Sequence, residues 1–582
     1  MPQIIFGHDL MLALDGGWKW HWGIRPHVDY YSPSGVVSYL LIDLGLRVSG
    51  GMAQALPAAI CLFAALLLPA SLYVSFSRMP PPIAAMTTLV MIAAVLAPHQ
   101  LRFPSHAFTY ATIYNRWGYG LLCVALLAIT SSSLRSSKAK ETVDGALAAT
   151  CVLILLFLKI SFGVLAILLF VSWLFVRRRL TEYYLAAVVA GGIWLAIFGF
   201  LLHWNFGNFG ADMLIALGAR EGLKIAGVFE SAVFLYPEIC LLVVLAFLWC
   251  VRGGWGLGQS LRRRLLEGSL FLGCYAGLAS AVILTNSPLG NLRESPLLSV
   301  AALFFLGGIF ARIEEGEPSP KAGLELKARI LPGLVVVLLS LLLCFGFLLK
   351  ANRTGLMSLA LLAGGWWVTT LLRKDASRLY PPLSRSFAVV TALLIFFPVL
   401  GRNATSMAQA GIWKLQEKSF PSDQVFADGP LAGIMIKAFG GDPPLPTTYV
   451  GKVYEGLALL EATGNSRTTV NALEFSNPFN VVRGVRPSRT GPTAWQLHIL
   501  YSCEIAPPPE RVFSQGEPVL LPKQFGDADQ RNIEALFNHY GEYLHRHFHP
   551  PIDSEQWWLY IPKDNSPYHA TVSANAALSS PD

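Results

Sequence analysis

The residues best suited to chemistry lie near the start of the chain, in a segment that mixes acidic, cationic and aromatic side chains. Asp9 and Asp15 are followed by the run GIRPHVDYYSPSG at residues 23–35, which contains Arg25 and Asp29. A carboxylate can take a proton from a hydroxyl group, and an arginine can bind an anion through its forked donors. Because these groups are concentrated just before an apolar run of membrane-spanning length, the segment is a candidate site.

A second mixture of cations and aromatic residues stands further along, before and at the start of another apolar run. Arg102 and His106 come first, and Tyr114, Asn115 and Arg116 follow. Guanidinium groups suit phosphate oxygens, so this segment is a candidate for anion binding.

Two more ionisable residues interrupt or border apolar runs. Lys159 lies near the middle of one long apolar stretch, and Glu238 follows a Tyr-Pro pair near the end of another. Ionisable side chains within membrane segments are costly, and they are candidates for a binding cavity by default.

The composition indicates what must hold these residues in place. Of the 582 residues, 54% are hydrophobic and only 14% are charged, and the mean hydropathy is +0.50. A soluble protein has about 25% charged residues, so a soluble globular enzyme is excluded. The net charge of +8 is modest and falls in short loops, which also excludes a nucleic-acid-coating chain. We therefore expect a polytopic α-helical membrane protein, in contact with lipids and with no nucleic-acid partner.

Apolar runs of bilayer-spanning length recur from residue 51 to residue 401, and we interpret them as about 12 membrane helices. The 32-residue apolar stretch 145–176 is too long for one helix and contains Lys159, so it predicts two short helices that meet at one membrane face. The predicted spans are 51–76, 82–98, 118–133, 145–157, 160–176, 183–202, 232–251, 266–285, 296–312, 330–349, 355–372 and 386–401.

The orientation follows from the lysines and arginines in the connecting loops. One alternate set of loops carries 19 basic residues and the other carries 8. Positive loops stay in the cytoplasm, so residues 1–50 and everything after 401 are predicted to lie on the outer face. In a bacterium this arrangement places an inner-membrane protein with its candidate site in the periplasm.

Residues 1–50 are predicted to be an outer segment with no helix ahead of them to carry them across the membrane. Either a first helix is missing upstream of Met1, or the following helix translocates this segment. Within it, residues 36–48 have an amphipathic pattern with Asp43 and Arg47 on the polar side. We expect this piece to lie along the outer membrane surface.

Residues 402–582 have the composition of a globular domain of ordinary size, about 180 residues. Strand and helix patterns alternate, which predicts an α/β domain on the outer side of the membrane domain 51–401. The predicted strands are 424–427, 468–475, 496–501, 518–522 and 557–561, and the predicted helices are 431–439, 454–462 and 529–545.

These features together resemble a known superfamily. An acidic residue in the first outer segment, the stretch G-x-R-P-H-x-D-Y-Y-S-P-x-G, about a dozen helices and an outer C-terminal α/β domain are similar to the C-type (GT-C) membrane glycosyltransferases. The similarity is greatest to the bacterial branch related to protein O-mannosyltransferases and lipid A aminoarabinose transferases. The usual Asp-Glu pair of the family reads His8-Asp9-Leu10 here, so the choice between Asp9 and Asp29 stays open.

The resemblance implies transfer of a sugar from a polyprenyl phosphate to a lipopolysaccharide, polysaccharide, lipid or protein acceptor. Inverting displacement needs a carboxylate to take the acceptor proton and cations to stabilise the departing phosphate. We predict Asp9 as the base and Asp29 as a second carboxylate, for the acceptor or for a divalent cation. Arg102, Arg116 and Lys159 are predicted to bind the phosphate. The remaining candidates, predicted to bind substrate, are His8, Arg25, His27, Tyr30, His106, Tyr114, Asn115 and Glu238.

Other roles compete with these predictions. Asp9 and Asp29 can be turn or cap residues, Arg116 can be an interfacial anchor, and Lys159 can extend to the lipid head groups. At the level of the whole protein, the alternative is a transporter or flippase of a lipid-linked saccharide. Transport predicts ionisable residues near the helix midplanes and often an internal repeat, and neither is conspicuous in the sequence.

Overall fold

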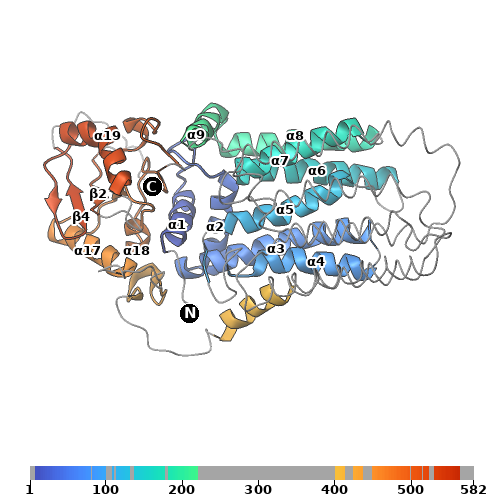
Figure 1. The fold of residues 1–582 in the computed structure, drawn as a ribbon, viewed down its shortest axis with the longest axis horizontal. Helices are drawn as coiled ribbons and strands as arrows, with labels where there is room; N and C mark the ends of the chain where they lie inside the picture. The colour runs from blue at the N-terminus through green and yellow to red at the C-terminus, as the bar shows by residue number, and fades with distance from the viewer. Residues whose placement is uncertain are drawn as a thin grey trace, which may run out of the picture.

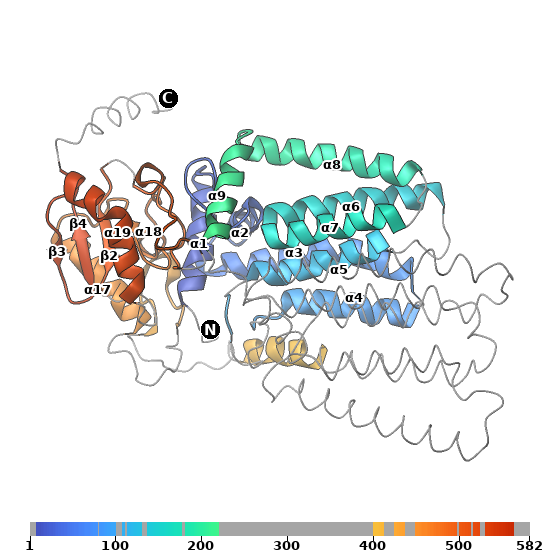
Figure 2. The ribbon, with the colours of Figure 1, turned by 45° about the horizontal axis from the view of Figure 1, so that its top comes forward.

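The computed structural model describes the following residues: 7–79, 81–99, 108–110, 113–130, 137–176, 181–219, 400–412, 424–436, 448–497, 500–513, 516–523 and 530–563. In this part of the chain a set of long helices lies roughly parallel, and a smaller α/β part sits at one end of the set (Figure 1). Helices α1 (Gly7–His21), α2 (Val36–Ser49) and α9 (Phe206–Gly218) lie between the two parts, as the rotated view also shows (Figure 2).

The first six predicted spans are helices in the structure. They are α3 (Met52–Phe76), α4 (Pro81–Leu96), α5 (Ile113–Thr130), α6 (Lys138–Leu158), α7 (Ile160–Val176) and α8 (Thr181–Leu201). Among the described helices, α3, α6 and α8 are long and apolar enough to cross a membrane. The predicted spans from 232 to 372 lie outside the described residues, and of the last span only residues 400 and 401 are described, within a helix at 400–412.

The predicted break in the apolar stretch 145–176 is confirmed at Lys159. This residue ends α6 in an extended conformation, and α7 begins at the next residue. The two helices pack closely, because Gly163 of α7 leaves no room for a Cβ atom against Leu156 of α6. Lys159 therefore stands at a fixed turn between two apolar helices.

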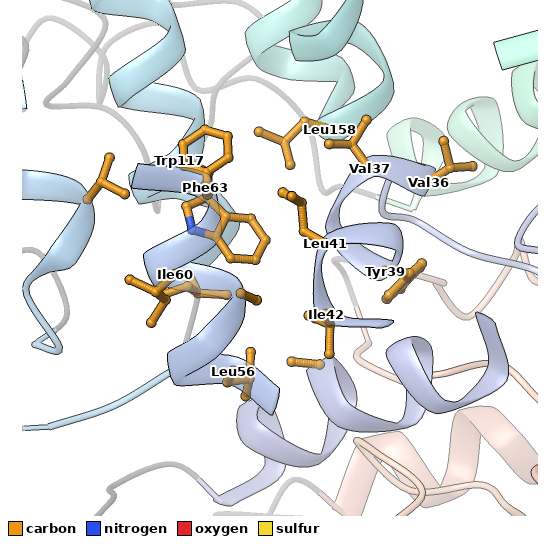
Figure 3. Packing of buried hydrophobic residues seen from close by; sticks show 14 of the residues in the cluster. Val36, Val37, Tyr39, Leu41, Ile42, Leu56, Ile60, Phe63, Trp117 and Leu158 are labelled. Atoms are coloured by element: carbon orange, nitrogen blue, oxygen red, sulfur yellow. The ribbon is translucent and has the colours of Figure 1, made fainter. Parts of the chain in front are cut away.

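The first segment is mostly helical, with α1 (Gly7–His21) and α2 (Val36–Ser49) joined by the turn at residues 22–35. The polar side of α2 is as predicted, since Arg47 Nε donates to Asp43 Oδ2 at 2.9 Å. Its buried apolar residues pack against α3, as Figure 3 shows for Ile42 and Leu56. The prediction that this helix lies along the membrane surface stays a prediction.

The C-terminal part is a small mixed sheet with helices. Strands β1 (Asn471–Ala472), β2 (Val519–Pro522), β3 (Ile552–Asp553) and β4 (Trp557–Tyr560) have the order β1-β2-β4-β3, and only the β1–β2 pair is parallel. The helices are α17 (Tyr449–Ala462), α18 (Phe479–Arg483) and α19 (Gln530–His547), with 3-10 turns η2 (Gly429–Leu431) and η3 (Pro509–Arg511).

The predicted elements of this part are confirmed in five of eight places. Strands form within 468–475, 518–522 and 557–561, and helices form over 454–462 and 529–545. Within the described residues, the predicted strands 424–427 and 496–501 contain only isolated bridges. The predicted helix 431–439 is wrong over its described part, 431–436, because Gly433 takes a positive φ of 80° and Met435 bridges back to Val425.

The two parts share one hydrophobic core. Buried residues of α3, such as Ile60, belong to the same cluster as Leu14 of α1 and as Phe426 and Trp557 of the C-terminal part. The first segment thus joins the helices to the C-terminal part, and residues from both parts surround the candidate site.

The exposed Cys503 of the C-terminal part provides a test of orientation. If this part lies on the outer face, a membrane-impermeant maleimide should label Cys503 in cells with a permeabilised outer membrane, without lysis. The Cys503→Ser variant should lose that label, which identifies the labelled position. Labelling that appears only after lysis would reverse the predicted topology.

Candidate functional site

Asp9 stands in the first turn of α1, where this helix meets the C-terminal part. The neighbouring His8 ring lies 4.5 Å from the Tyr449 ring and 5.5 Å from the Phe475 ring. Asp9 is half-buried, and it forms no hydrogen bond or ion pair with the described residues. Burial raises the pKa of Asp9 to about 7, even though a helix N-terminus favours the charged carboxylate.

A carboxylate with a pKa of about 7 suits proton removal near neutral pH. The best general base has a pKa close to the working pH, because it is then both ionised and basic enough to accept a proton. Asp9 has this property from burial alone, since no described charge stabilises its ionised form. The geometry therefore favours Asp9 over a solvated turn carboxylate as a candidate base.

Asp29 has a different environment. Its Oδ2 accepts the backbone N–H of Arg25 at 2.7 Å, which closes the turn, and its Oδ1 lies 3.0 Å from Arg489 of the C-terminal part. The charge of Asp29 acts on the pKa of Lys19, so these two residues lie near each other. Lys19 follows Asp9 by ten residues in α1. At 1.5 Å per helical residue, Lys19 is about 15 Å from Asp9 along α1. The two predicted carboxylates thus stand at opposite ends of this helix.

A buried polar cluster lies along the middle and end of α1. Asp15 and Lys19 are both fully buried, and Lys19 Nζ lies 3.9 Å from Asp15 Oδ2 and 5.0 Å from the centre of the Tyr30 ring. Lys19 also donates to the carbonyl of Ser488 in the C-terminal part. Among the described residues, the two carboxylate oxygens of Asp15 and the hydroxyl of Tyr30 have no hydrogen-bond partner.

Burial controls the ionisation of this cluster. It raises the pKa of Asp15 to about 6, with Lys19 opposing the shift, and it lowers the pKa of Lys19, with Asp15 opposing that shift. Burial also raises the pKa of the Tyr30 hydroxyl well above its usual value. Tyr30 is therefore a neutral member of this cluster.

Lys159, which is predicted to bind the phosphate, meets two predicted substrate-binding residues at the end of α6. Lys159 Nζ donates to Asn115 Oδ1 at 3.0 Å, and it lies 4.8 Å from the centre of the Tyr114 ring. The ammonium group thus contacts an amide oxygen and an aromatic face. A lysine ammonium can also make charge-assisted hydrogen bonds to phosphate oxygens.

Arg116 directly follows Asn115 in the chain and makes different contacts. Its guanidinium donates to the carbonyl of Ala94 at 2.5 Å and also to the carbonyl of His99, and its side chain is buried. These contacts hold the end of α4 against α5. The predicted role of Arg116 in phosphate binding stays a prediction.

The other predicted residues divide between the first segment and the undescribed part. The Arg25 guanidinium stacks 4.0 Å over the Trp20 ring, and burial lowers its pKa. His27 is fully buried, and its Nδ1 lies 2.9 Å from Asp212 Oδ2 in α9 (Phe206–Gly218). Arg102, His106 and Glu238 lie outside the described residues.

No group of three or more His, Cys, Asp or Glu side chains that could hold a metal ion occurs within the described residues. The divalent cation predicted beside Asp29 stays a prediction.

The sequence did not identify three buried or partly buried charged residues as part of the candidate site: Lys19 of α1, Asp212 of α9 and Arg511 of η3. Arg511 lies 2.6 Å from Asp212, although the two residues are 299 positions apart in the chain. The spacing of Asp15 and Lys19, four residues apart, was a usable signal, because residues at this spacing share one face of a helix.

Comparison with known proteins gave two similar solved structures. No protein-family model and no curated protein matches the chain. ArnT from Cupriavidus metallidurans bound to undecaprenyl phosphate is 12% identical, with 97% of this chain and 95% of that chain covered and a TM-score of 0.39. The same protein in the apo state is 13% identical, with 100% and 96% covered and a TM-score of 0.38.

Proposed function

We propose that the protein is a membrane glycosyltransferase that moves a sugar from a polyprenyl phosphate to an acceptor on the outer face of the membrane. The observation that carries the proposal is Asp9, a half-buried carboxylate with a pKa raised to about 7 and no partner among the described residues. It stands at the junction of the helices and the C-terminal part, where a lipid-borne donor and a polar acceptor can meet.

In the proposed reaction, Asp9 accepts the proton of the acceptor hydroxyl. The acceptor oxygen then bonds to the anomeric carbon while the bond from that carbon to the phosphate oxygen breaks, and the electron pair leaves with the phosphate. Attack opposite the leaving group inverts the configuration at the anomeric carbon. The proton on Asp9 passes to water.

Lys159 supports the donor half of the proposal. It lies at the turn between two apolar helices, beside Asn115 and Tyr114, so its ammonium is positioned to contact a lipid-borne phosphate. Polyprenyl phosphate leaves with additional negative charge on its phosphate oxygens, and a nearby cation stabilises that charge as it develops.

We expect Lys159→Gln to weaken donor binding about ten- to a hundredfold, since a charge-assisted contact to phosphate contributes about 1.5 to 3 kcal/mol. The amide of glutamine is polar and about one bond shorter than the lysine side chain, and it removes the charge. The measurement is the KM for the polyprenyl-phosphate sugar, with Lys159→Arg as the charge-retaining comparison. Equal KM values in the wild type and Lys159→Gln would remove Lys159 from the donor site.

The test of the whole proposal uses purified protein in detergent, a polyprenyl-phosphate sugar and a membrane extract as acceptor. Release of free polyprenyl phosphate that depends on the acceptor supports the transferase. Tight donor binding without cleavage, together with movement of the lipid across vesicles, would instead support the transporter.

A further inference from the structure

Asp212 of α9 joins three segments that are far apart in the chain. It is fully buried, and its Oδ2 accepts from His27 Nδ1 at 2.9 Å and from the backbone N–H of Ser32 at 3.2 Å. Its Oδ1 accepts from Arg511 of the C-terminal part at 2.6 Å. One carboxylate thus binds the turn 22–35, α9 and the C-terminal part together.

His27 takes an uncommon backbone conformation at this point. Its φ is +66°, in the left-handed region that few residues other than glycine adopt readily. Its backbone N–H donates to the Tyr30 carbonyl at 2.9 Å, and its side chain is fixed by Asp212. Because a carboxylate accepts only, His27 Nδ1 carries the proton in this contact.

The same group of residues supports the end of α6. The Phe209 ring of α9 lies 4.9 Å from the His27 ring and 5.0 Å from the Phe157 ring, in the last turn of α6. On the other side of the turn, the Gly35 N–H donates to the Leu158 carbonyl at 3.2 Å. Gly35 leaves no room for a Cβ atom against the Phe157 carbonyl. Lys159 directly follows Leu158 in the chain.

We propose that Asp212 is a positioning residue, which through His27 and Arg511 holds the turn 22–35 and the C-terminal part against the end of α6 that carries Lys159. The role of Lys159 in donor binding rests on the proposed function. Loss of the Asp212 contacts releases the turn from α9, and the end of α6 loses the support of Gly35 and Phe209. Lys159 then shifts relative to the donor phosphate.

Two variants of His27 separate this role from a general loss of folding. In His27→Asn the amide Nδ2 occupies nearly the place of Nδ1 and can donate to Asp212, and asparagine tolerates positive φ. His27→Asp has the same shape and the same tolerance, but it offers a second carboxylate where a donor is needed. Arg511→Gln removes the cation from the opposite side of Asp212 at a partly exposed position.

The first measurement is the Kd for undecaprenyl phosphate in detergent, alongside the donor KM and kcat. His27→Asp and Arg511→Gln should weaken binding of undecaprenyl phosphate about tenfold, raise KM and lower kcat, because a displaced Lys159 contacts the phosphate less well both in the bound donor and as the phosphate leaves. His27→Asn should bind like the wild type. If both weakening variants are folded and bind like the wild type, or if His27→Asn is as weak as His27→Asp, the positioning role is overturned.

The second measurement, hydrogen exchange, needs no ligand. Backbone amides in residues 24–35 and 500–513 should exchange faster in His27→Asp than in His27→Asn. Equal exchange in the two variants overturns the role of Asp212 even if the wild type binds the lipid. If the wild type does not bind undecaprenyl phosphate, the proposed function fails, whereas faster exchange in His27→Asp still supports the joining of the three segments by Asp212.

Discussion

Asp9→Asn should lower sugar transfer by about a hundred- to ten-thousandfold, which is the usual contribution of a positioned general base. The amide has the shape of the carboxyl group but cannot accept the proton of the acceptor hydroxyl. Binding of the polyprenyl-phosphate donor should change little, because the donor phosphate is predicted to contact Lys159 and not Asp9. The measurement is the acceptor-dependent release of polyprenyl phosphate at saturating donor.

The pH dependence of transfer gives the same prediction a second test. Burial raises the pKa of Asp9 to about 7, and the base must be ionised to act. The rate should therefore fall about tenfold per pH unit below this pKa and level off above it. A rate that stays constant from pH 5 to pH 8 in the wild type would contradict the assignment of Asp9 as the base.

Asp29→Asn is the matched comparison for Asp9→Asn. Asp29 is held by the backbone N–H of Arg25 and by Arg489, so its amide replacement keeps one acceptor for the turn and loses an exposed ion pair. Exposed pairs contribute little, about 0 to 1 kcal/mol, so a much smaller loss of transfer is expected. If Asp29→Asn is inactive and Asp9→Asn is active, the base is Asp29.

The six long apolar helices from α3 to α8 were readable from the sequence, because a helix that spans a lipid bilayer must meet a strict requirement. A spanning helix needs about 20 mostly apolar residues, and this demand is readable without knowledge of any partner. The break at Lys159 was predictable for the same reason, since the stretch exceeded the length of one span. Strands 518–522 and 557–561 were also readable, because each is a short apolar run bounded by polar residues.

The first segment was harder to predict, because its structure depends on neighbours. Gly16 and Gly17 argue against a helix by propensity, yet both lie inside α1. A Cβ atom on Gly16 would lie 2.1 Å from the Tyr39 ring, and one on Gly17 would lie 2.4 Å from Ile42. The glycines thus allow α2 to approach α1, and this tertiary reason is invisible in a single sequence.

The candidate site was predictable by residue type but not by pairing. The segment around Asp9 and Asp29 contains the right chemistry, but nothing in the sequence says that Asp29 is paired with Arg489 while Asp9 has no partner among the described residues. Likewise, His27 and Asp212 are 185 residues apart. Such contacts are set by the packing of α9 and the C-terminal part, and therefore only the structure reveals them.

The buried pair of Lys19 and Asp15 leads to the second prediction of large effect, on stability. Lys19→Met fills nearly the same space but removes the ammonium from a site with no exposure to water. Asp15 then stays buried without a cation, and the Ser488 carbonyl loses its donor. Leaving a buried charge without its partner typically costs about 3 to 5 kcal/mol, so the free energy of unfolding in detergent should fall by about this amount.

A double variant and an exposed lysine give the controls. Lys19→Met combined with Asp15→Asn should be more stable than Lys19→Met alone, because the unpaired charge is gone. Lys138→Met removes a lysine that is 81% exposed and paired with Glu182, and it should cost at most about 1 kcal/mol. Equal losses in Lys19→Met and Lys138→Met would show that the Lys19 ammonium does not stabilise the junction.

The pH dependence of Lys19→Met identifies Asp15 as the cause of its instability. In the wild type, burial raises the pKa of Asp15 to about 6 against the opposing effect of Lys19, so removal of the ammonium should raise this pKa further. A carboxyl group whose pKa is higher in the folded state than in the unfolded chain binds more protons when folded, and stability is then lost as the pH rises through the folded pKa. The free energy of unfolding of Lys19→Met should therefore fall from pH 5 to pH 8, and adding Asp15→Asn should remove most of that fall. A fall that persists unchanged in the double variant would assign the pH dependence to another group.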